Sequence, residues 1–194
     1  EANLLQVSFL KPHHPFDPPA PWDGMYDPES LSLLPGWTEQ CPEDDLAYHR
    51  GHRPHEKLTE PKLRRALAYY YATISQLDSY VMKMVDMLKQ KGVYDDTVII
   101  YTSDHGDYLG YHHMIGKLNH MYDPLVRIPL IVKPAGPSGE GGQRSSALVS
   151  NTGIGAHCLA RAGVDGEPGV GGRDFAAMPD DTSAGGKPAH DAHE

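Results

Sequence analysis

A long amphipathic helix that leads directly into an apolar strand constrains the fold more than any other feature of the chain. Apolar residues recur at spacings of three and four from Leu63 to Leu88, which gives one apolar stripe along a helix. Thr59 is a suitable residue to cap the start of this helix, and Gly92 is a suitable residue to end it. The run from Thr97 to Tyr101 is entirely β-branched or aromatic. Such a run is typical of a strand buried on both faces in a parallel sheet.

Further short apolar segments lie on both sides of this pair. Leu4 to Leu10 is predicted to form a strand that ends before Pro12, and Ile128 to Val132 is predicted to form another. Ala147 to Ser150 has a weaker strand pattern, followed by a weak helix that reaches Ala162. A helix between two strands is a βαβ pattern, so the predicted fold class is α/β.

The bulk properties exclude several classes of protein. A chain of 194 residues is long enough for one domain with a core. Its formal net charge of −9 argues against a nucleic-acid partner, which would require a basic surface. Cys41 and Cys158 fit neither a zinc ribbon nor a disulfide framework. No apolar stretch approaches the roughly 20 residues that cross a bilayer, so no membrane partner is expected.

Three regions are expected to lack regular structure or to be incomplete. Residues 12–54 are rich in Pro, Asp and Gly, with Trp22, Tyr26 and Trp37 interspersed, which predicts a lid-like segment tied down by aromatic side chains. Residues 179–194 have the composition of a disordered tail. The start of the sequence has neither an initiating Met nor a signal-peptide pattern, so we expect it to begin inside a longer protein.

Polar residues follow the strand that ends at Tyr101. In open α/β sheets, ligands bind outside the carboxyl ends of strands. Gly106 permits a sharp turn that would point the carboxylate of Asp104 and the imidazole of His105 into one pocket. Oxygen and nitrogen ligands of this kind suit a divalent cation. In the alternative interpretation, Asp104 caps a helix and His105 lies on the surface.

The residues around this pair form one ordered pattern that resembles the sulfatase family. The pattern consists of TSDHGDYLGYH at 102–112, GK at 116–117 and RIPLIV at 127–132. Two earlier stretches, FLKPHHPF at 9–16 and KGVYDDT at 91–97, are also similar to segments of that family. The resemblance covers roughly residues 4 to 175.

The resemblance implies a fold, a set of site residues and a cofactor. The fold is a three-layer α/β/α sandwich with a mostly parallel sheet, alkaline phosphatase-like and incomplete, over residues 1–178. Asp104 and His105 would bind the catalytic cation, Lys117 would contact the charged oxygens of the substrate, and His13 would be the active-site histidine. His112 matches the histidine of the family's Leu-Gly-x-His element, as a catalytic or an orienting group. Calcium is the preferred cation, and the imidazole ligand leaves manganese or zinc open.

The implied chemistry is hydrolysis of an anionic ester. Cleaving a sulfate, phosphonate or phosphate monoester places negative charge on the ester oxygens, which a cation and a lysine stabilise. A histidine can protonate the departing oxygen near neutral pH. Sulfate monoesters of small molecules or glycans are the first expectation, and phosphonate or phosphate monoesters are the alternative. The segment from Asp17 to Pro54 is the expected contributor to substrate choice, while the compartment and the oligomeric state stay open.

Several parts of the family's pattern are absent from this chain. It contains no Cys/Ser-x-Pro-x-Arg motif, which carries the family's nucleophile, and no upstream pair of metal-binding aspartates. Near the C-terminus, Gly153 stands where the family has a helix-capping Asp, and Ala156 and His157 replace Pro-Thr. We therefore expect about half of an active site, in a fragment, a truncated product or a degenerate copy. A non-catalytic remnant that binds a cation or a partner protein is the competing hypothesis.

Overall fold

The computed structural model describes residues 3–38, 40–49, 55–136, 142–164 and 171–175. The chain separates into two compact units, and all five predicted site residues lie in the unit formed by Gln6–Ser138. Glu1–Leu5 and Gly139–Glu194 form the other unit. The tail predicted to be disordered, residues 179–194, lies outside the described residues.

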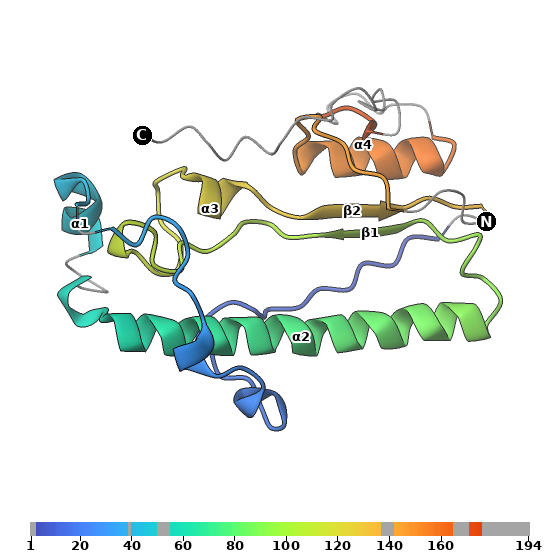
Figure 1. The fold of residues 1–194 in the computed structure, drawn as a ribbon. Helices are drawn as coiled ribbons and strands as arrows, with labels where there is room; N and C mark the ends of the chain where they lie inside the picture. The colour runs from blue at the N-terminus through green and yellow to red at the C-terminus, as the bar shows by residue number, and fades with distance from the viewer. Residues whose placement is uncertain (1–2, 39, 50–54, 137–141, 165–170, 176–194) are drawn as a thin grey trace. The chain divides into compact units, whose positions relative to one another are not determined.

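The predicted helix is the longest element of the larger unit. Helix α2 (Glu60–Gln90) begins after Thr59, whose backbone is extended and whose side chain makes no capping hydrogen bond (Figure 1). Gly92 ends it in the left-handed conformation, with the N–H of Gly92 donating to the Lys89 carbonyl and that of Val93 to the Leu88 carbonyl. This pair of bonds is a Schellman motif, so the predicted glycine stop is confirmed.

The strands of the described residues form one antiparallel pair. Strand β1 (Ile99–Thr102) pairs with β2 (Leu130–Lys133), with Tyr101 opposite Ile131. Tyr101 is 38% exposed and Ile131 63% exposed, so the prediction that the first strand is buried on both faces is wrong. The connection between the strands contains only short helices. The chain returns along β1 in the opposite direction, so these two strands do not form the parallel pairing of a βαβ unit.

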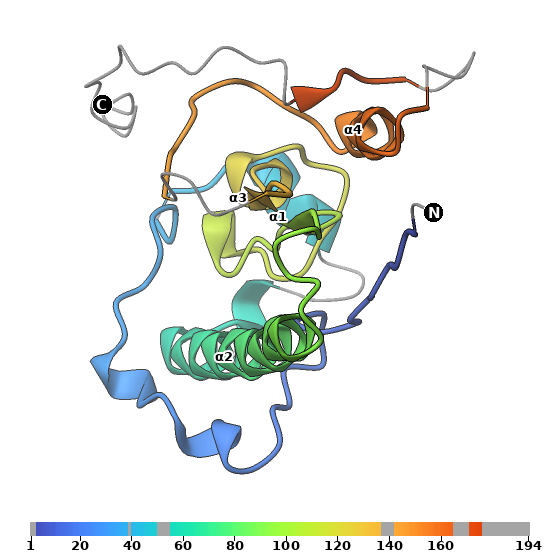
Figure 2. The same ribbon diagram turned by 90° about the vertical axis from the view of Figure 1, so that its right-hand side faces the viewer.

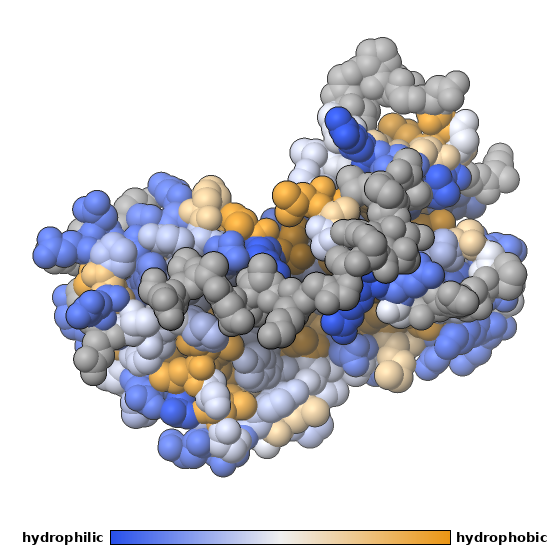
Figure 3. All heavy atoms as spheres, turned by 45° about the horizontal axis from the view of Figure 1, so that its top comes forward, coloured by the Kyte–Doolittle hydropathy of each residue, from blue (hydrophilic) through white to orange (hydrophobic). Residues whose placement is uncertain are grey.

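Two other predicted strands are absent from the described residues. Residues 4–10 and 147–150 have no strand conformation, and Leu4, Leu5 and Leu10 are more than half exposed. An apolar run becomes a strand only where another strand offers it a row of backbone donors and acceptors. Apolar side chains that reach the surface are visible in Figure 3 as orange areas among the blue polar ones.

Two apolar clusters hold the larger unit together. In the first, Leu63 and Leu67 of α2 are fully buried against Leu109. Partly buried side chains from the 16–37 segment, from α2 and from the residue two before it pack around them, namely Phe16, Leu31, Leu33, Leu34, Trp37, Leu58, Tyr70 and Tyr71. In the second, Tyr108 and Met114 pack with Leu125 of the short helix α3 (Asp123–Val126). Burying one such side chain contributes about 1.5–3 kcal/mol. Both clusters include residues from the 108–114 loop, which is therefore packed on two sides.

The segment predicted to be a lid is irregular but contributes to the core. It contains the short helices η1 (Trp22–Gly24), η2 (Pro28–Ser30) and α1 (Glu43–His49), and η3 (His55–Lys57) follows it. Figure 2, which views α2 end-on, shows the part with η1 and η2 beside that helix. The hydroxyl of Tyr26 lies 2.8 Å from Ser75 Oγ on α2, and the Tyr26 ring meets the edge of Tyr71. The prediction that aromatic residues tie the segment down is confirmed.

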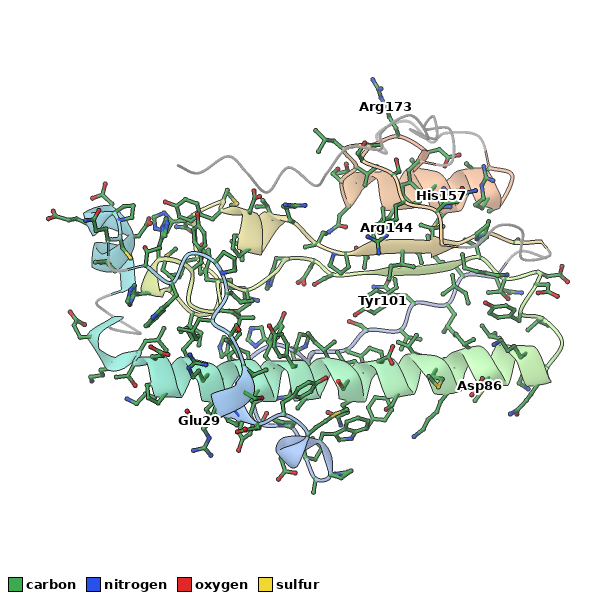
Figure 4. The ribbon with its side chains drawn as sticks, viewed as in Figure 1. Glu29, Asp86, Tyr101, Arg144, His157 and Arg173 are labelled. Atoms are coloured by element: carbon green, nitrogen blue, oxygen red, sulfur yellow. The ribbon has the colours of Figure 1, made fainter. Side chains whose placement is uncertain are left out.

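The smaller unit contains helix α4 (Thr152–Arg161), which confirms the weak helix expected before Ala162. His157 of α4, labelled in Figure 4, is buried, with its Nδ1 2.6 Å from Asp174 Oδ1. A Cβ at Gly153 would lie 2.8 Å from the Arg173 carbonyl oxygen. Glycine therefore occupies this position because the backbone of residue 173 packs directly against the first turn of α4. No helix of the described residues is long and apolar enough to cross a membrane.

Candidate functional site

The turn after β1 is held against helix α3 by Gly106. Its N–H donates to the Leu125 carbonyl at 2.7 Å. A Cβ at this position would overlap the carbonyl oxygen of Pro124 and lie 3.1 Å from its carbonyl carbon. Glycine is thus required by close backbone packing. The preceding residues, Asp104 and His105, are carried on this turn directly after the strand.

Asp104, His105 and Lys117 lie together. His105 Nδ1 is 2.7 Å from the Gly106 carbonyl oxygen, which can only accept, so this nitrogen carries the proton. The Nε2 lone pair then accepts a hydrogen bond from Lys117 Nζ at 2.7 Å. Asp104 Oδ2 lies 3.6 Å from the same Nε2 atom. The structure therefore brings three of the five predicted site residues to one point.

The charges of this group favour an ionised carboxylate. Burial acts to raise the pKa of Asp104, but the neighbouring His105, backbone hydrogen bonds and the Lys117 ammonium outweigh it and lower that pKa below its ordinary value. The Asp104 side chain is 86% exposed, so the carboxylate is accessible to a ligand. Ser103 supports the turn by donating from Oγ to the His105 carbonyl at 2.7 Å.

Asp107 closes the loop of residues 107–116 that directly precedes Lys117. Asp107 Oδ1 accepts from the N–H of Leu109 at 3.0 Å and from that of Gly116 at 2.9 Å. Gly110 is left-handed, and a Cβ there would overlap Leu63 of α2, so glycine lets the loop pack on the helix. The loop needs several left-handed residues, which are Leu109, Gly110, His112, His113 and Gly116. Lys117 is positioned because both ends of this loop are bonded to one carboxylate.

His112 belongs to a second polar group. Its Nδ1 lies 2.6 Å from Oδ2 of Asp45, which is 2% exposed. The hydroxyl of Tyr122 donates to the same carboxylate at 3.0 Å, and His120 Nδ1 lies 3.4 Å from its other oxygen. Burial and then the hydrogen bond and charge of Asp45 raise the pKa of Tyr122, which keeps its hydroxyl a neutral donor. Asp45 is not evident as a site residue from the sequence, because it stands in an acidic run that resembles an ordinary charged helix start.

His13 makes its contacts within its own segment. Its N–H donates to the Leu10 carbonyl at 3.1 Å, and its Nδ1 lies 2.7 Å from the His14 carbonyl oxygen. Its ring also stacks on that of His14, with centroids 4.0 Å apart. Among the contacts of the described residues, none joins His13 to the group formed by Asp104, His105 and Lys117.

The donor set fits a divalent cation in part. An ionised carboxylate at Asp104 and an imidazole nitrogen with a lone pair at His105 are suitable ligands. Within the described residues, no cluster of three or more His, Cys, Asp or Glu side chains is arranged to hold a metal. Among the described residues, Asp104 and His105 are therefore candidate ligands only as a pair, and the ammonium of Lys117 bonds to His105.

The comparisons with known proteins agree on one family. Residues 1–164 match the family model described as Sulfatase. The multifunctional alkaline phosphatase superfamily protein PehA of Trinickia caryophylli is 33% identical over 157 residues, covering 72% of this chain and 30% of that protein. The choline-sulfatase of Rhizobium meliloti is 35% identical over 137 residues, covering 69% of this chain and 26% of that protein. This chain thus spans less than a third of the length of these relatives.

Solved structures agree with the sequence comparisons. The phosphonate monoester hydrolase SpPMH from Silicibacter pomeroyi superposes with a TM-score of 0.71 at 29% identity, covering 85% of this chain and 35% of that one. The phosphonate monoester hydrolase of Agrobacterium radiobacter superposes with a TM-score of 0.56 at 30% identity, covering 65% of this chain and 28% of that one. Because the family model matches most of its residues, the chain belongs to the sulfatase family.

Proposed function

We propose that this chain carries about half of the active site of a metal-dependent hydrolase that cleaves sulfate monoesters. The observation that supports this is the meeting of Asp104, His105 and Lys117, with Lys117 Nζ 2.7 Å and Asp104 Oδ2 3.6 Å from one imidazole nitrogen. In the same proposal, residues 1–178 belong to a three-layer α/β/α sandwich. The likeness to the Silicibacter pomeroyi enzyme supports that architecture.

Each residue of the group has a role that its chemistry suits. Asp104 and His105 would hold the divalent cation, preferably Ca²⁺, with Mn²⁺ or Zn²⁺ as alternatives. The bound cation would stabilise negative charge on the ester oxygens. Lys117 would contact the non-bridging oxygens, where an ammonium stabilises the same charge. The Gly106 carbonyl assists by fixing the proton on His105 Nδ1, which leaves Nε2 as the ligand atom.

The two remaining histidines have separate proposed roles. His13 would protonate the departing oxygen, a role that its place in the Pro-His-x-Pro segment supports. His112 bonds to Asp45 through Nδ1, and this contact supports an orienting role rather than direct contact with the ester. We further propose that the nucleophile is not supplied by these 194 residues, because they contain no Cys/Ser-x-Pro-x-Arg motif.

Phosphonate monoester hydrolysis is the second candidate. Two solved structures that this chain resembles are phosphonate monoester hydrolases. An Asp-His pair and a lysine suit either tetrahedral anion. The two chemistries therefore differ here only in the substrate that the rest of the site admits. A glycan or small-molecule sulfate ester remains the first proposal for the substrate.

Calorimetric titration of the 194-residue chain with Ca²⁺, Mn²⁺ and Zn²⁺ tests the metal ligands. Asp104→Ala should weaken cation binding at least tenfold, because one of two ligands is lost. Asp86→Ala is the matched control, since Asp86 is an exposed carboxylate on α2 (Figure 4). Equal affinities in Asp104→Ala and wild type would overturn the proposed ligands.

Anion binding tests Lys117 and the choice of ester. With cation present, Lys117→Ala should weaken sulfate binding about tenfold, while Lys91→Ala, at an exposed lysine, should not. Tighter binding of methylphosphonate than of sulfate would favour the second candidate. The chain alone should not turn over nitrophenyl sulfate or nitrophenyl phosphonate. Turnover that disappeared in Asp104→Ala would refute both the half-site proposal and the non-catalytic alternative.

A further inference from the structure

Asp45 is the most deeply buried carboxylate among the described residues, and it lies outside the group of Asp104, His105 and Lys117. It is 2% exposed and belongs to α1. Its partners His112 and Tyr122 are 67 and 77 residues further along the chain, on either side of Lys117 in the sequence. A buried carboxylate is costly unless donors satisfy its oxygens. Here His112 and Tyr122 donate to it, and His120 lies within ion-pair distance.

The contact with Asp45 determines which nitrogen of His112 carries a proton. An ionised carboxylate only accepts hydrogen bonds, so Nδ1, at 2.6 Å, must be protonated. The ring also contacts two aromatic side chains, stacking on Tyr111 with centroids 4.1 Å apart and meeting Tyr122 in a T-shaped arrangement at 5.0 Å. Position and tautomer of His112 are thus set by residues around Asp45.

The backbone at His112 needs such support. Its φ of 48° and ψ of 39° place it in the left-handed region, and His113 follows with a φ of 57°. Non-glycine residues in this region carry strain that persists only where surrounding contacts hold them. Five residues further along the same loop is Lys117, so relaxation at His112 would act on the position of the ammonium.

The segment before Asp45 is bound to the same loop by further contacts. The N–H of His112 donates to the Gly36 carbonyl at 2.9 Å, and His113 Nε2 lies 2.7 Å from the Thr38 carbonyl oxygen. The rings of Trp37 and His113 lie 3.9 Å apart. Residues 36–38 therefore contact the left-handed part of the loop, and Asp45 adds a buried charged contact to His112.

We propose that Asp45 is a positioning residue that holds His112 and, through the 109–117 loop, sets the place of Lys117 beside His105. The importance of Lys117 rests on the proposed function, but the structural coupling does not. Asp45 acts through other residues and does not contact the ester. Residues 36–38 and Asp45 would then be coupled to the lysine through the loop, so a change in these residues would alter the position of the anion-binding group.

Nitrogen-15 NMR of the 194-residue chain tests the coupling directly. The wild type should show His112 protonated at Nδ1 and His105 Nε2 accepting a hydrogen bond. Asp45→Ala should remove the first signature and shift the second. Asp44→Ala, at the exposed neighbouring carboxylate, should change neither. Asp45→Asn keeps one acceptor oxygen and should restore the His112 signature in part.

Sulfate binding in the presence of cation gives the second measurement. Asp45→Ala should weaken it at least fivefold, and Tyr122→Phe should weaken it less, because one donor to Asp45 is lost while the ring remains. If Asp45→Ala does not fold, Asp45→Asn and Tyr122→Phe provide the same comparison. A folded Asp45 variant with unchanged His105 resonances would overturn the positioning role. If the wild-type chain binds no sulfate but Asp45→Ala still shifts the His105 resonances, the proposed function is overturned and the positioning role of Asp45 is not.

Discussion

Replacing Gly106 by alanine would place a methyl group against the backbone of α3. The added Cβ would overlap the Pro124 carbonyl oxygen and lie 3.4 Å from Leu125 Cα, so the turn and the helix must separate. Separation breaks the 2.7 Å hydrogen bond from the Gly106 N–H to the Leu125 carbonyl. Loss of that bond costs about 1 kcal/mol. Overpacking adds about 1–3 kcal/mol, and the stiffer unfolded chain offsets about 0.4–1 kcal/mol.

The net effect should be a loss of about 1–4 kcal/mol in the free energy of unfolding. For a chain of this size, each kcal/mol lowers the melting temperature by about 2–4 °C. Differential scanning calorimetry of Gly106→Ala should therefore show a decrease of about 2–14 °C. Sulfate binding should weaken as well, because the Gly106 carbonyl orients the His105 ring.

Gly24→Ala is the control for this substitution. A Cβ at Gly24 would meet no atom within 4 Å, so its melting temperature should stay near that of the wild type. Equal melting temperatures for the two alanine variants would refute the claim that close backbone packing requires glycine at 106. Unchanged sulfate affinity in a destabilised Gly106→Ala variant would show instead that this packing does not reach His105.

Two further predictions concern the loop and its buried surroundings. Asp107→Ala removes the acceptor of two hydrogen bonds, from the N–H of Leu109 at 3.0 Å and from that of Gly116 at 2.9 Å. At about 1 kcal/mol per bond, the loop loses about 2 kcal/mol in total, so the hydrogen exchange of both N–H groups should accelerate about thirtyfold. Asp107→Asn, which keeps an acceptor oxygen, should exchange at nearly the wild-type rate, and equal exchange in both variants would contradict the closure of the loop by Asp107. Burial, followed by the charges of Asp107, Tyr101 and Tyr71, raises the pKa of Tyr70 to about 12. Because the pKa of Tyr70 in the folded chain exceeds the ordinary 10.0, its contribution to stability is present below pH 10 and is lost as the pH rises through 12. The free energy of unfolding of Tyr70→Phe, measured with denaturant, should therefore fall less over this window than that of the wild type. Parallel curves of free energy against pH for the two proteins would contradict the shift.

The group formed by Asp104, His105 and Lys117 could be predicted from the resemblance to the sulfatase family, and its three members are close along the chain. Asp104 and His105 directly follow a strand, and Lys117 lies only twelve residues beyond His105. A short loop with left-handed glycines then suffices to return the lysine to the pair. Asp45 could not be found in this way, because its bond to His112 joins residues 67 positions apart.

Helix α2 was determined by the sequence itself, and the pairing of the strands was decided by tertiary structure. A helix forms its hydrogen bonds within its own segment, so the apolar stripe, Thr59 and Gly92 were sufficient to predict its extent. A strand requires a partner, and the alternation of apolar residues does not name that partner or its direction. β1 consequently pairs antiparallel with β2, while the equally apolar Leu4 to Leu10 remains unpaired with any strand of the described residues. The same reasoning applies to the carboxylate of Asp45, whose burial depends on donors that only the folded chain brings to it.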